Sequence, residues 1–189
     1  MIGDSHANGI AKAFEVFYSD NQNIVHIKDL HAFPGKHCYN VDYSNVDIPT
    51  GSKILLHFGE IDIRKSLPKY KNTEDTVKRY IDKSVDYFKD YELFFIKPIP
   101  QAEDHLTWEF KPGATIGENK RAYSLEERLE EQNIFYSTLD QYADNVIDTP
   151  SAINTNILKA ENTDDGCHLN LENSLKLIRY IDIAINPGV

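Results

Sequence analysis

Short apolar runs alternate along this chain with longer stretches in which apolar residues recur every three or four positions. The apolar runs cover residues 24–27, 53–58, 93–96 and 145–147. The longer, helix-compatible stretches cover residues 7–19, 73–89, 124–142 and 171–185. Such alternation is typical of βαβ units, in which helices cover both faces of a parallel sheet. We therefore expect an α/β fold built on a parallel sheet.

Two of the predicted helices have a clear apolar face. The face of helix 73–89 contains Val77, Tyr80, Ile81, Val85 and Phe88. The face of helix 171–185 contains Leu171, Leu175, Ile178, Ile181 and Ile185. A helix with one apolar stripe packs that stripe against the core. We expect both faces to lie against the sheet.

Length and composition favour one folded domain over residues 1–189. The chain is 41% hydrophobic and 26% charged, which is a globular composition. Its longest apolar runs are far shorter than the roughly 20 residues of a membrane span, and its start lacks the basic and apolar regions of a secretory signal. We expect a cytoplasmic protein of undetermined oligomeric state.

The charge and the cysteines exclude several classes of partner. A formal charge of −10 repels phosphate backbones and anionic lipids, so we expect neither nucleic acid nor membrane as a partner. Cys38 and Cys167 are too few for a disulfide scaffold and have no C-x-x-C spacing, which gives no support to zinc or thioredoxin-like chemistry. Both are interpreted as reduced thiols.

Parallel sheets bind ligands at the carboxyl ends of their strands, and polar residues follow several of the predicted strands. Residues 3–6 (Gly-Asp-Ser-His) follow Met1 and Ile2, so either the first strand is unusually short or the sequence as written omits several residues before it. Gly35 lies in a turn after strand 24–27, where its N–H can approach a bound oxygen. Residues 59–64 (Gly-Glu-Ile-Asp-Ile-Arg) follow strand 53–58, and residues 165–168 (Asp-Gly-Cys-His) precede the last helix.

Three of these residues can supply nucleophilic catalysis. A serine hydroxyl needs a base to remove its proton, and that base needs a carboxylate to orient it. Ser5, His168 and Asp165 offer this combination if the loop before the last helix folds over the sheet. Three alternatives stay open: Ser5 as a helix N-cap, Asp165 as an Asx turn beside an ordinary histidine, and a metal site formed by Asp164, Asp165 and His168.

The sequence resembles the SGNH/GDSL hydrolase family in its first and last blocks. Gly3-Asp4-Ser5 is similar to the Gly-Asp-Ser block, and Asp165-Gly166-Cys167-His168 is similar to the Asp-x-x-His block, at the expected ends of the chain. The resemblance spans essentially all 189 residues. It implies a three-layer α/β/α sandwich with a flavodoxin-like parallel sheet of about five strands. It also implies that Ser5 is the nucleophile, His168 the general base and Asp165 its orienting partner.

The third family block, Gly-x-Asn-Asp, differs in this chain. Gly59-Glu60-Ile61-Asp62 places isoleucine where the family has asparagine, as in a divergent member. Losing one oxyanion-hole donor typically costs about 10² to 10³ in rate. The resemblance implies oxyanion or substrate contacts from the N–H of Ser5, from Gly35 and from Gly59. For Glu60 and Arg64 two alternatives stay open. They either replace the missing donor or form an internal salt bridge with Asp62.

The remaining histidines and one long segment are weaker candidates. His6 is interpreted as a helix-start residue, and the other histidines show no ligand spacing: His26, His31, His37, His57 and His105. The segment from Pro98 to Tyr123 lacks periodicity, and its Trp108 and Phe110 either stack on a sugar ring or pack as a surface excursion.

Together these features predict a serine esterase that removes a small acyl group, such as acetyl, from a carbohydrate or similar polar substrate. No metal or organic cofactor is expected. A catalytically silent carbohydrate-binding or assembly module on the same scaffold is the main alternative, because Ile61 donates no hydrogen bond. Acyl transfer to a sugar in place of water is the third possibility.

Overall fold

The strands of the computed structural model form one parallel sheet; the structure describes residues 1–19, 30–103 and 123–187. The strands are β1 (Ile2–Gly3), β2 (His31–Ala32), β3 (Lys53–His57), β4 (Glu92–Ile96) and β5 (Val146–Ile147). They pair in the order β2-β1-β3-β4-β5, all parallel. This is the order of flavodoxin-like, doubly wound sheets, so the predicted fold class is confirmed.

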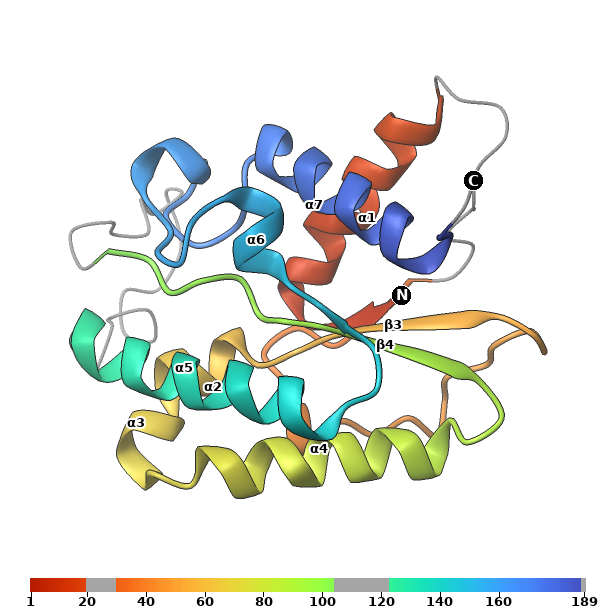
Figure 1. Cartoon of the computed structure of the whole chain (residues 1–189), viewed down its shortest axis with the longest axis horizontal. Coiled ribbons are helices and arrows are strands. Elements are labelled where there is room, and N and C mark those ends of the chain that lie inside the picture. Colours follow the sequence, from red (N-terminus) through yellow and green to blue (C-terminus); the bar gives the residue numbers. More distant parts are fainter. Residues whose placement is uncertain (20–29, 104–122, 188–189) are drawn as a thin grey trace.

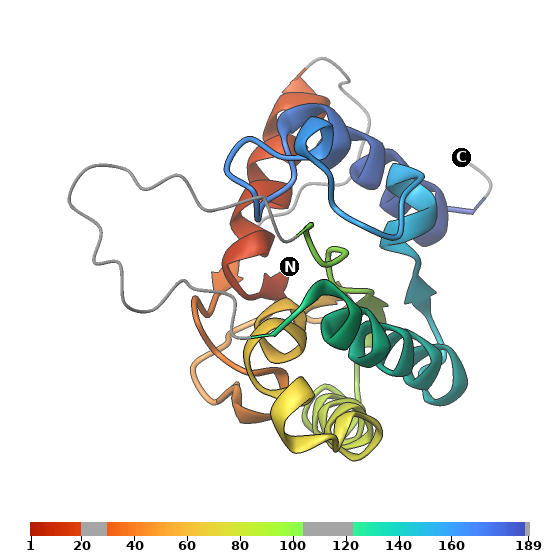
Figure 2. The ribbon, with the colours of Figure 1, turned by 90° about the vertical axis from the view of Figure 1, so that its left-hand side faces the viewer.

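Helices cover both faces of the sheet (Figure 1). The first face carries α1 (Ser5–Ser19), α6 (Thr149–Ile153) and α7 (Leu171–Ile185). The second carries α2 (Glu60–Lys65), α3 (Leu67–Tyr70), α4 (Thr73–Tyr87) and α5 (Leu125–Tyr142). Two 3₁₀ turns, η1 (Cys38–Asn40) and η2 (Ala160–Asn162), lie in the connections. Figure 2 shows the same two groups of helices from the side, with α1 beside α7.

The sheet separates two apolar clusters, and β3 contributes to both. Ile54 and Leu56 point into the cluster under α4 and α5, while Leu55 points into the cluster under α1 and α7. This alternation follows from the two-residue period of a strand. The predicted helix faces are largely correct, but Val85 is 49% exposed and Leu171 is 53% exposed. Both lie toward the solvent edge of their stripes.

Gly3 allows β1 to pack closely between its neighbours. A Cβ at this position would lie 2.6 Å from the Cβ of Ala7 and 2.6 Å from the carbonyl oxygen of His57. Only glycine fits between the start of α1 and the adjacent strand without a shift. The first strand, β1, comprises only Ile2 and Gly3.

A buried arginine holds both described ends of the long segment from Pro98 to Tyr123. Arg128 on α5 is fully buried. Its Nη1 donates to the carbonyl oxygen of Ala102 at 3.0 Å, and its Nε donates to that of Tyr123 at 3.2 Å. Several sequence-based interpretations lie outside the described residues: those on strand 24–27, His26, His105, Trp108 and Phe110.

Within the described part of the chain, no helix has both the length and the apolar character that crossing a membrane requires. Cys38 and Cys167 are both free thiols, as interpreted from the sequence, and the structure buries both.

Candidate active site

Ser5 lies at the junction of β1 and α1, at the carboxyl end of a central strand. Asp4 caps the helix: its Oδ1 accepts the N–H of His6 at 3.0 Å, and its carbonyl oxygen accepts the N–H of Ala7 at 3.2 Å. The capping role that was an alternative for Ser5 is therefore filled by Asp4. Ser5 itself is half-buried.

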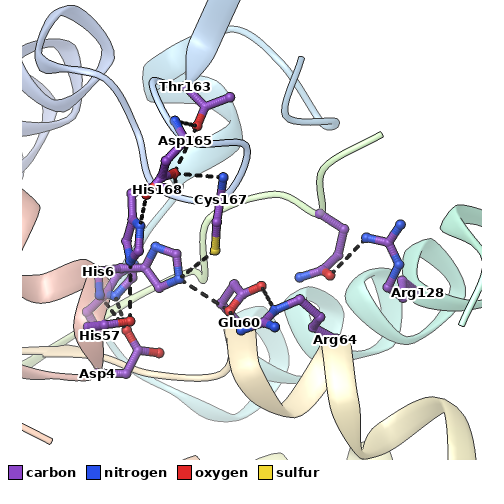
Figure 3. Close-up of polar contacts among 12 residues, drawn as sticks. Asp4, His6, His57, Glu60, Arg64, Arg128, Thr163, Asp165, Cys167 and His168 are labelled. Carbon is purple, nitrogen blue, oxygen red and sulfur yellow. Dashed lines mark hydrogen bonds and ion pairs between the residues drawn. The ribbon is translucent and has the colours of Figure 1, made fainter. Parts of the chain in front are cut away.

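Asp165 organises the loop that precedes α7. Its Oδ1 accepts the backbone N–H groups of Cys167 at 2.9 Å and His168 at 2.8 Å. Its Oδ2 lies 2.7 Å from Nδ1 of His168. The Asx turn considered from the sequence is thus present, and the same carboxylate also fixes the imidazole ring (Figure 3).

The loop brings His168 to Ser5 across 163 positions of sequence. Nε2 of His168 lies 3.4 Å from Oγ of Ser5. With Nδ1–H donating to Asp165, Nε2 carries the lone pair that faces the hydroxyl. Separations of this size are common before substrate binds and shorten in the reacting complex. The arrangement suits transfer of the hydroxyl proton to the imidazole.

The carboxyl of Asp165 is held in its ionised form. Partial burial opposes ionisation, but the hydrogen bonds from the ring and backbone of His168, together with the N–H of Cys167, outweigh it. They lower the pKa of Asp165 well below its ordinary value. A charged carboxylate at this place stabilises the imidazolium that forms when His168 takes a proton.

His6 lies directly behind the Ser5–His168 pair. It is 2% exposed, its ring centroid lies 4.5 Å from that of His168, and its Nε2 lies 3.2 Å from Oε2 of Glu60. Burial opposes protonation, but the charges of Cys167 and Asp4 and the hydrogen bonds to Cys167 and Glu60 raise the pKa of His6 well above its ordinary value. The sequence interpretation of His6 as a helix-start residue missed this setting.

Glu60 and Arg64 form a buried ion pair on α2. Nε of Arg64 donates to Oε1 of Glu60 at 2.7 Å and Nη2 donates to Oε2 at 3.3 Å. Burial raises the pKa of Glu60. The charge of Arg64 and the hydrogen bond with His6 have a larger, opposite effect, so the pKa of Glu60 lies well below its ordinary value. The salt bridge considered from the sequence is present between these two residues. Ile61 between them is 5% exposed and offers no donor.

Solved structures share this architecture, although no family model and no curated protein matches the sequence. One described as a platelet activating factor from Streptococcus pneumonia has a TM-score of 0.66 at 18% identity, covering 98% of this chain and 82% of that chain. A GDSL-like lipase from Bacteroides thetaiotaomicron has a TM-score of 0.62 at 13% identity, covering 100% and 87%. The chain has the GDSL hydrolase fold. An acetyl xylan esterase has a TM-score of 0.58 at 15% identity, covering 98% of each chain.

In this GDSL hydrolase fold, Asp62 of the third block joins α2 to the loop after β2. Its Oδ2 accepts the N–H of Cys38 at 2.9 Å, and its Oδ1 lies 2.9 Å from Nδ1 of His37. Both oxygens of Asp62 thus contact the loop that follows β2. The loop carries Gly35 in an exposed turn with φ +73°, a left-handed conformation that favours glycine.

Gly59 of the GDSL hydrolase fold has a packing role that the sequence did not indicate. It precedes α2 with φ +120°, and a Cβ there would lie 2.4 Å from Cζ of Phe135 and 2.8 Å from Cγ of Pro98. The turn thus brings α2 directly under α5. Ser5 contacts His168, whereas Glu60 and Arg64 are connected to the site through His6.

Proposed function

We propose that this chain is a serine esterase in which Ser5 is the nucleophile, His168 the general base and then acid, and Asp165 the residue that orients His168. The single observation that carries the proposal is the line Ser5 Oγ, His168 Nε2, His168 Nδ1 and Asp165 Oδ2, with separations of 3.4 and 2.7 Å between the three side chains. Geometry of this kind is shared by serine hydrolases on unrelated folds.

The reaction follows from these positions. Nε2 of His168 accepts the hydroxyl proton as Oγ of Ser5 bonds to the acyl carbon, which gives a tetrahedral oxyanion. The ester C–O bond breaks, the departing alcohol takes the proton from Nε2, and an acyl-enzyme remains. His168 then deprotonates a water molecule, whose attack releases the acid and frees Ser5.

The oxyanion needs hydrogen-bond donors close to Ser5. We assign the N–H of Ser5 to this role, because the caps from Asp4 engage the N–H groups of His6 and Ala7 and the helix start favours negative charge. Gly35 on the loop held by Asp62 is the second proposed donor. Because Ile61 supplies none, we expect a slower enzyme than one with the complete third block, by about 10² to 10³.

The proposed substrate is a small acyl ester, O-acetyl in the first instance, on a carbohydrate or similar polar alcohol. Support comes from the acetyl xylan esterase that shares the fold and from the absence of an evident long apolar lid in the sequence. Aryl acetates and acetylated xylo-oligosaccharides are the compounds to test. Hydrolysis of long-chain esters with neither acetate touched would contradict this choice.

A fluorophosphonate probe tests the nucleophile. We expect covalent capture at Ser5 in the wild type and its loss in Ser5→Ala and His168→Ala. Ser44→Ala, at an exposed serine, is the matched control and should retain capture. No labelling of the folded wild type would favour the silent carbohydrate-binding module. If acetyl esters are consumed without release of acetate, analysis of the sugar products would identify an acyltransferase.

A further inference from the structure

Three side chains at the site are of the kinds that bind transition metals. His6, Cys167 and His168 each offer one ligand atom, and these atoms all lie within 4.8 Å of one another. Sγ of Cys167 lies 3.9 Å from Nε2 of His6. Two of the three residues, His6 and Cys167, have no part in the proposed acyl transfer, and both are buried.

We propose that His6, Cys167 and His168 bind Zn²⁺, and that the bound ion blocks the esterase. Imidazole and thiolate ligands select zinc and related transition metals, whereas Mg²⁺ and Ca²⁺ prefer oxygen ligands. With bonds of about 2.0–2.3 Å, neighbouring ligands of a tetrahedral zinc lie roughly 3.3–3.8 Å apart. The three atoms lie within 4.8 Å of one another, so they need to approach by no more than about 1.5 Å.

The surroundings of these ligands also suit a metal. Nδ1 of His168 donates to the carboxylate of Asp165 at 2.7 Å, and a carboxylate behind a histidine commonly orients it for zinc. Oε2 of Glu60 lies 3.2 Å from Nε2 of His6, close to the spacing of adjacent ligands, so Glu60, which also accepts a hydrogen bond from Arg64, can complete the coordination. Glu60 and Cys167 also line a small cavity.

Binding would change the protonation of two groups. The thiol of Cys167 releases its proton to solvent and becomes a thiolate. If Nε2 of His6 carries a proton, that proton also passes to solvent. Burial raises the pKa of the Cys167 thiol in the metal-free protein, and the ion supplies the opposing charge. No other bond is made or broken.

Occupancy removes the general base. Nε2 of His168 is the atom that faces Oγ of Ser5, and an imidazole nitrogen bonded to zinc has no lone pair for a proton. The ion is therefore an inhibitor and not a cofactor. This consequence rests on the proposed esterase function, whereas binding of the metal does not.

Cobalt spectroscopy tests the site without reference to activity. Co²⁺ added to the metal-free protein should give a thiolate-to-cobalt charge-transfer band in the near ultraviolet. The band should disappear in Cys167→Ala and Cys167→Ser and persist in Cys38→Ala, the matched change at the other buried cysteine. A band unaffected by both Cys167 variants, or no band in the wild type, would overturn the proposal.

The rate of fluorophosphonate capture tests the inhibition. We expect Zn²⁺ to slow capture of the wild type and a chelator to restore it. Each variant is compared with its own metal-free rate of capture. Cys167→Ala should need at least about 10- to 100-fold more Zn²⁺ than the wild type for the same fractional slowing of capture. A loss of that size in metal affinity is typical even of a missing outer-shell partner. A cobalt band with no capture at any metal concentration would leave the metal site standing and reject the esterase. Zinc inhibition that is equal in wild type and Cys167→Ala would reject the site.

Discussion

The carboxylate of Asp62 lies 2.9 Å from Nδ1 of His37, 25 positions earlier in the chain. Its other oxygen accepts the N–H of Cys38 at 2.9 Å. The aspartate at the start of α2 thereby fixes the loop that follows β2, two residues beyond Gly35. Although isoleucine stands where the GDSL family has asparagine, Asp62 connects this segment to the proposed oxyanion loop.

This contact predicts a pH-dependent contribution of His37 to stability. The hydrogen bond with Asp62 raises the pKa of His37 against a smaller effect of burial. A raised folded-state pKa gives stabilisation that is complete below the unfolded value, about 6.5, and is lost as the pH rises through the folded value. Urea unfolding should show the gap between wild type and His37→Ala to be larger near about pH 6 than near about pH 9. A gap that widens with rising pH would contradict the assignment.

Asp165→Asn should slow fluorophosphonate capture by about 10² to 10⁴ while the protein stays folded. The asparagine oxygen can still accept the N–H groups of Cys167 and His168, so the loop is retained. Its amide, however, would face Nδ1 and favour the tautomer that places a proton on Nε2, toward Ser5. Asp164→Asn, at the exposed neighbouring position, is the control and should capture at the wild-type rate. Equal rates in both variants would remove Asp165 from the mechanism.

Two glutamates with the same spacing to a basic partner should differ strongly in their effect on stability. Glu60 and Glu74 both lie in the first turn of a helix and pair with a basic residue four positions on, at 2.7 and 2.5 Å. Glu60 is buried, and its loss leaves Arg64 and His6 without this partner, so Glu60→Ala should lower the free energy of unfolding by about 3–5 kcal/mol.

Glu74 is exposed, and Glu74→Ala should therefore cost about 0.5 kcal/mol. Chemical denaturation of the two variants under one set of conditions measures both values. Similar costs would show that burial does not decide the strength of these pairs.

Gly3→Ala and Gly9→Ala should change stability in opposite directions. A Cβ on Gly3 would lie 2.6 Å from backbone and side-chain atoms of its neighbours, whereas a Cβ on Gly9 meets nothing within 4 Å. Overpacking at Gly3 should cost about 1–3 kcal/mol. Replacing Gly9 inside α1 should add about 1 kcal/mol through helix propensity. Thermal or urea unfolding separates the two, and a neutral Gly3→Ala would contradict the close packing of β1.

The sequence predicted the long elements well, because their periodicity is strong. The predicted helix 73–89 is α4, helix 171–185 is α7, and strand 53–58 is β3 within a residue. The helix α2 was not predicted, since six residues with alternating charged and apolar side chains show no helical period. The edge strand β2, beside β1, comprises only His31 and Ala32, too few residues for a pattern to reveal.

At the candidate site, the sequence indicated the triad but not the residues behind it. Ser5, Asp165 and His168 follow from motif spacing and from the placement of loops at strand ends. The burial of His6 and its contacts with Glu60 and Cys167 depend on α2 and the loop before α7 lying against α1, which is a tertiary effect. The position of His6 directly after Ser5 was the one local signal that could have suggested its role.

The packing of α1 beside α7 has a consequence for how the protein is made. A chain emerging from the ribosome exposes its serine early and its histidine 163 residues later. Until the last helix docks, the hydroxyl has no base, and a long-range contact of this kind forms late and slowly. The proposed esterase is therefore inactive as a nascent polypeptide and gains its base only when α7 has packed beside α1.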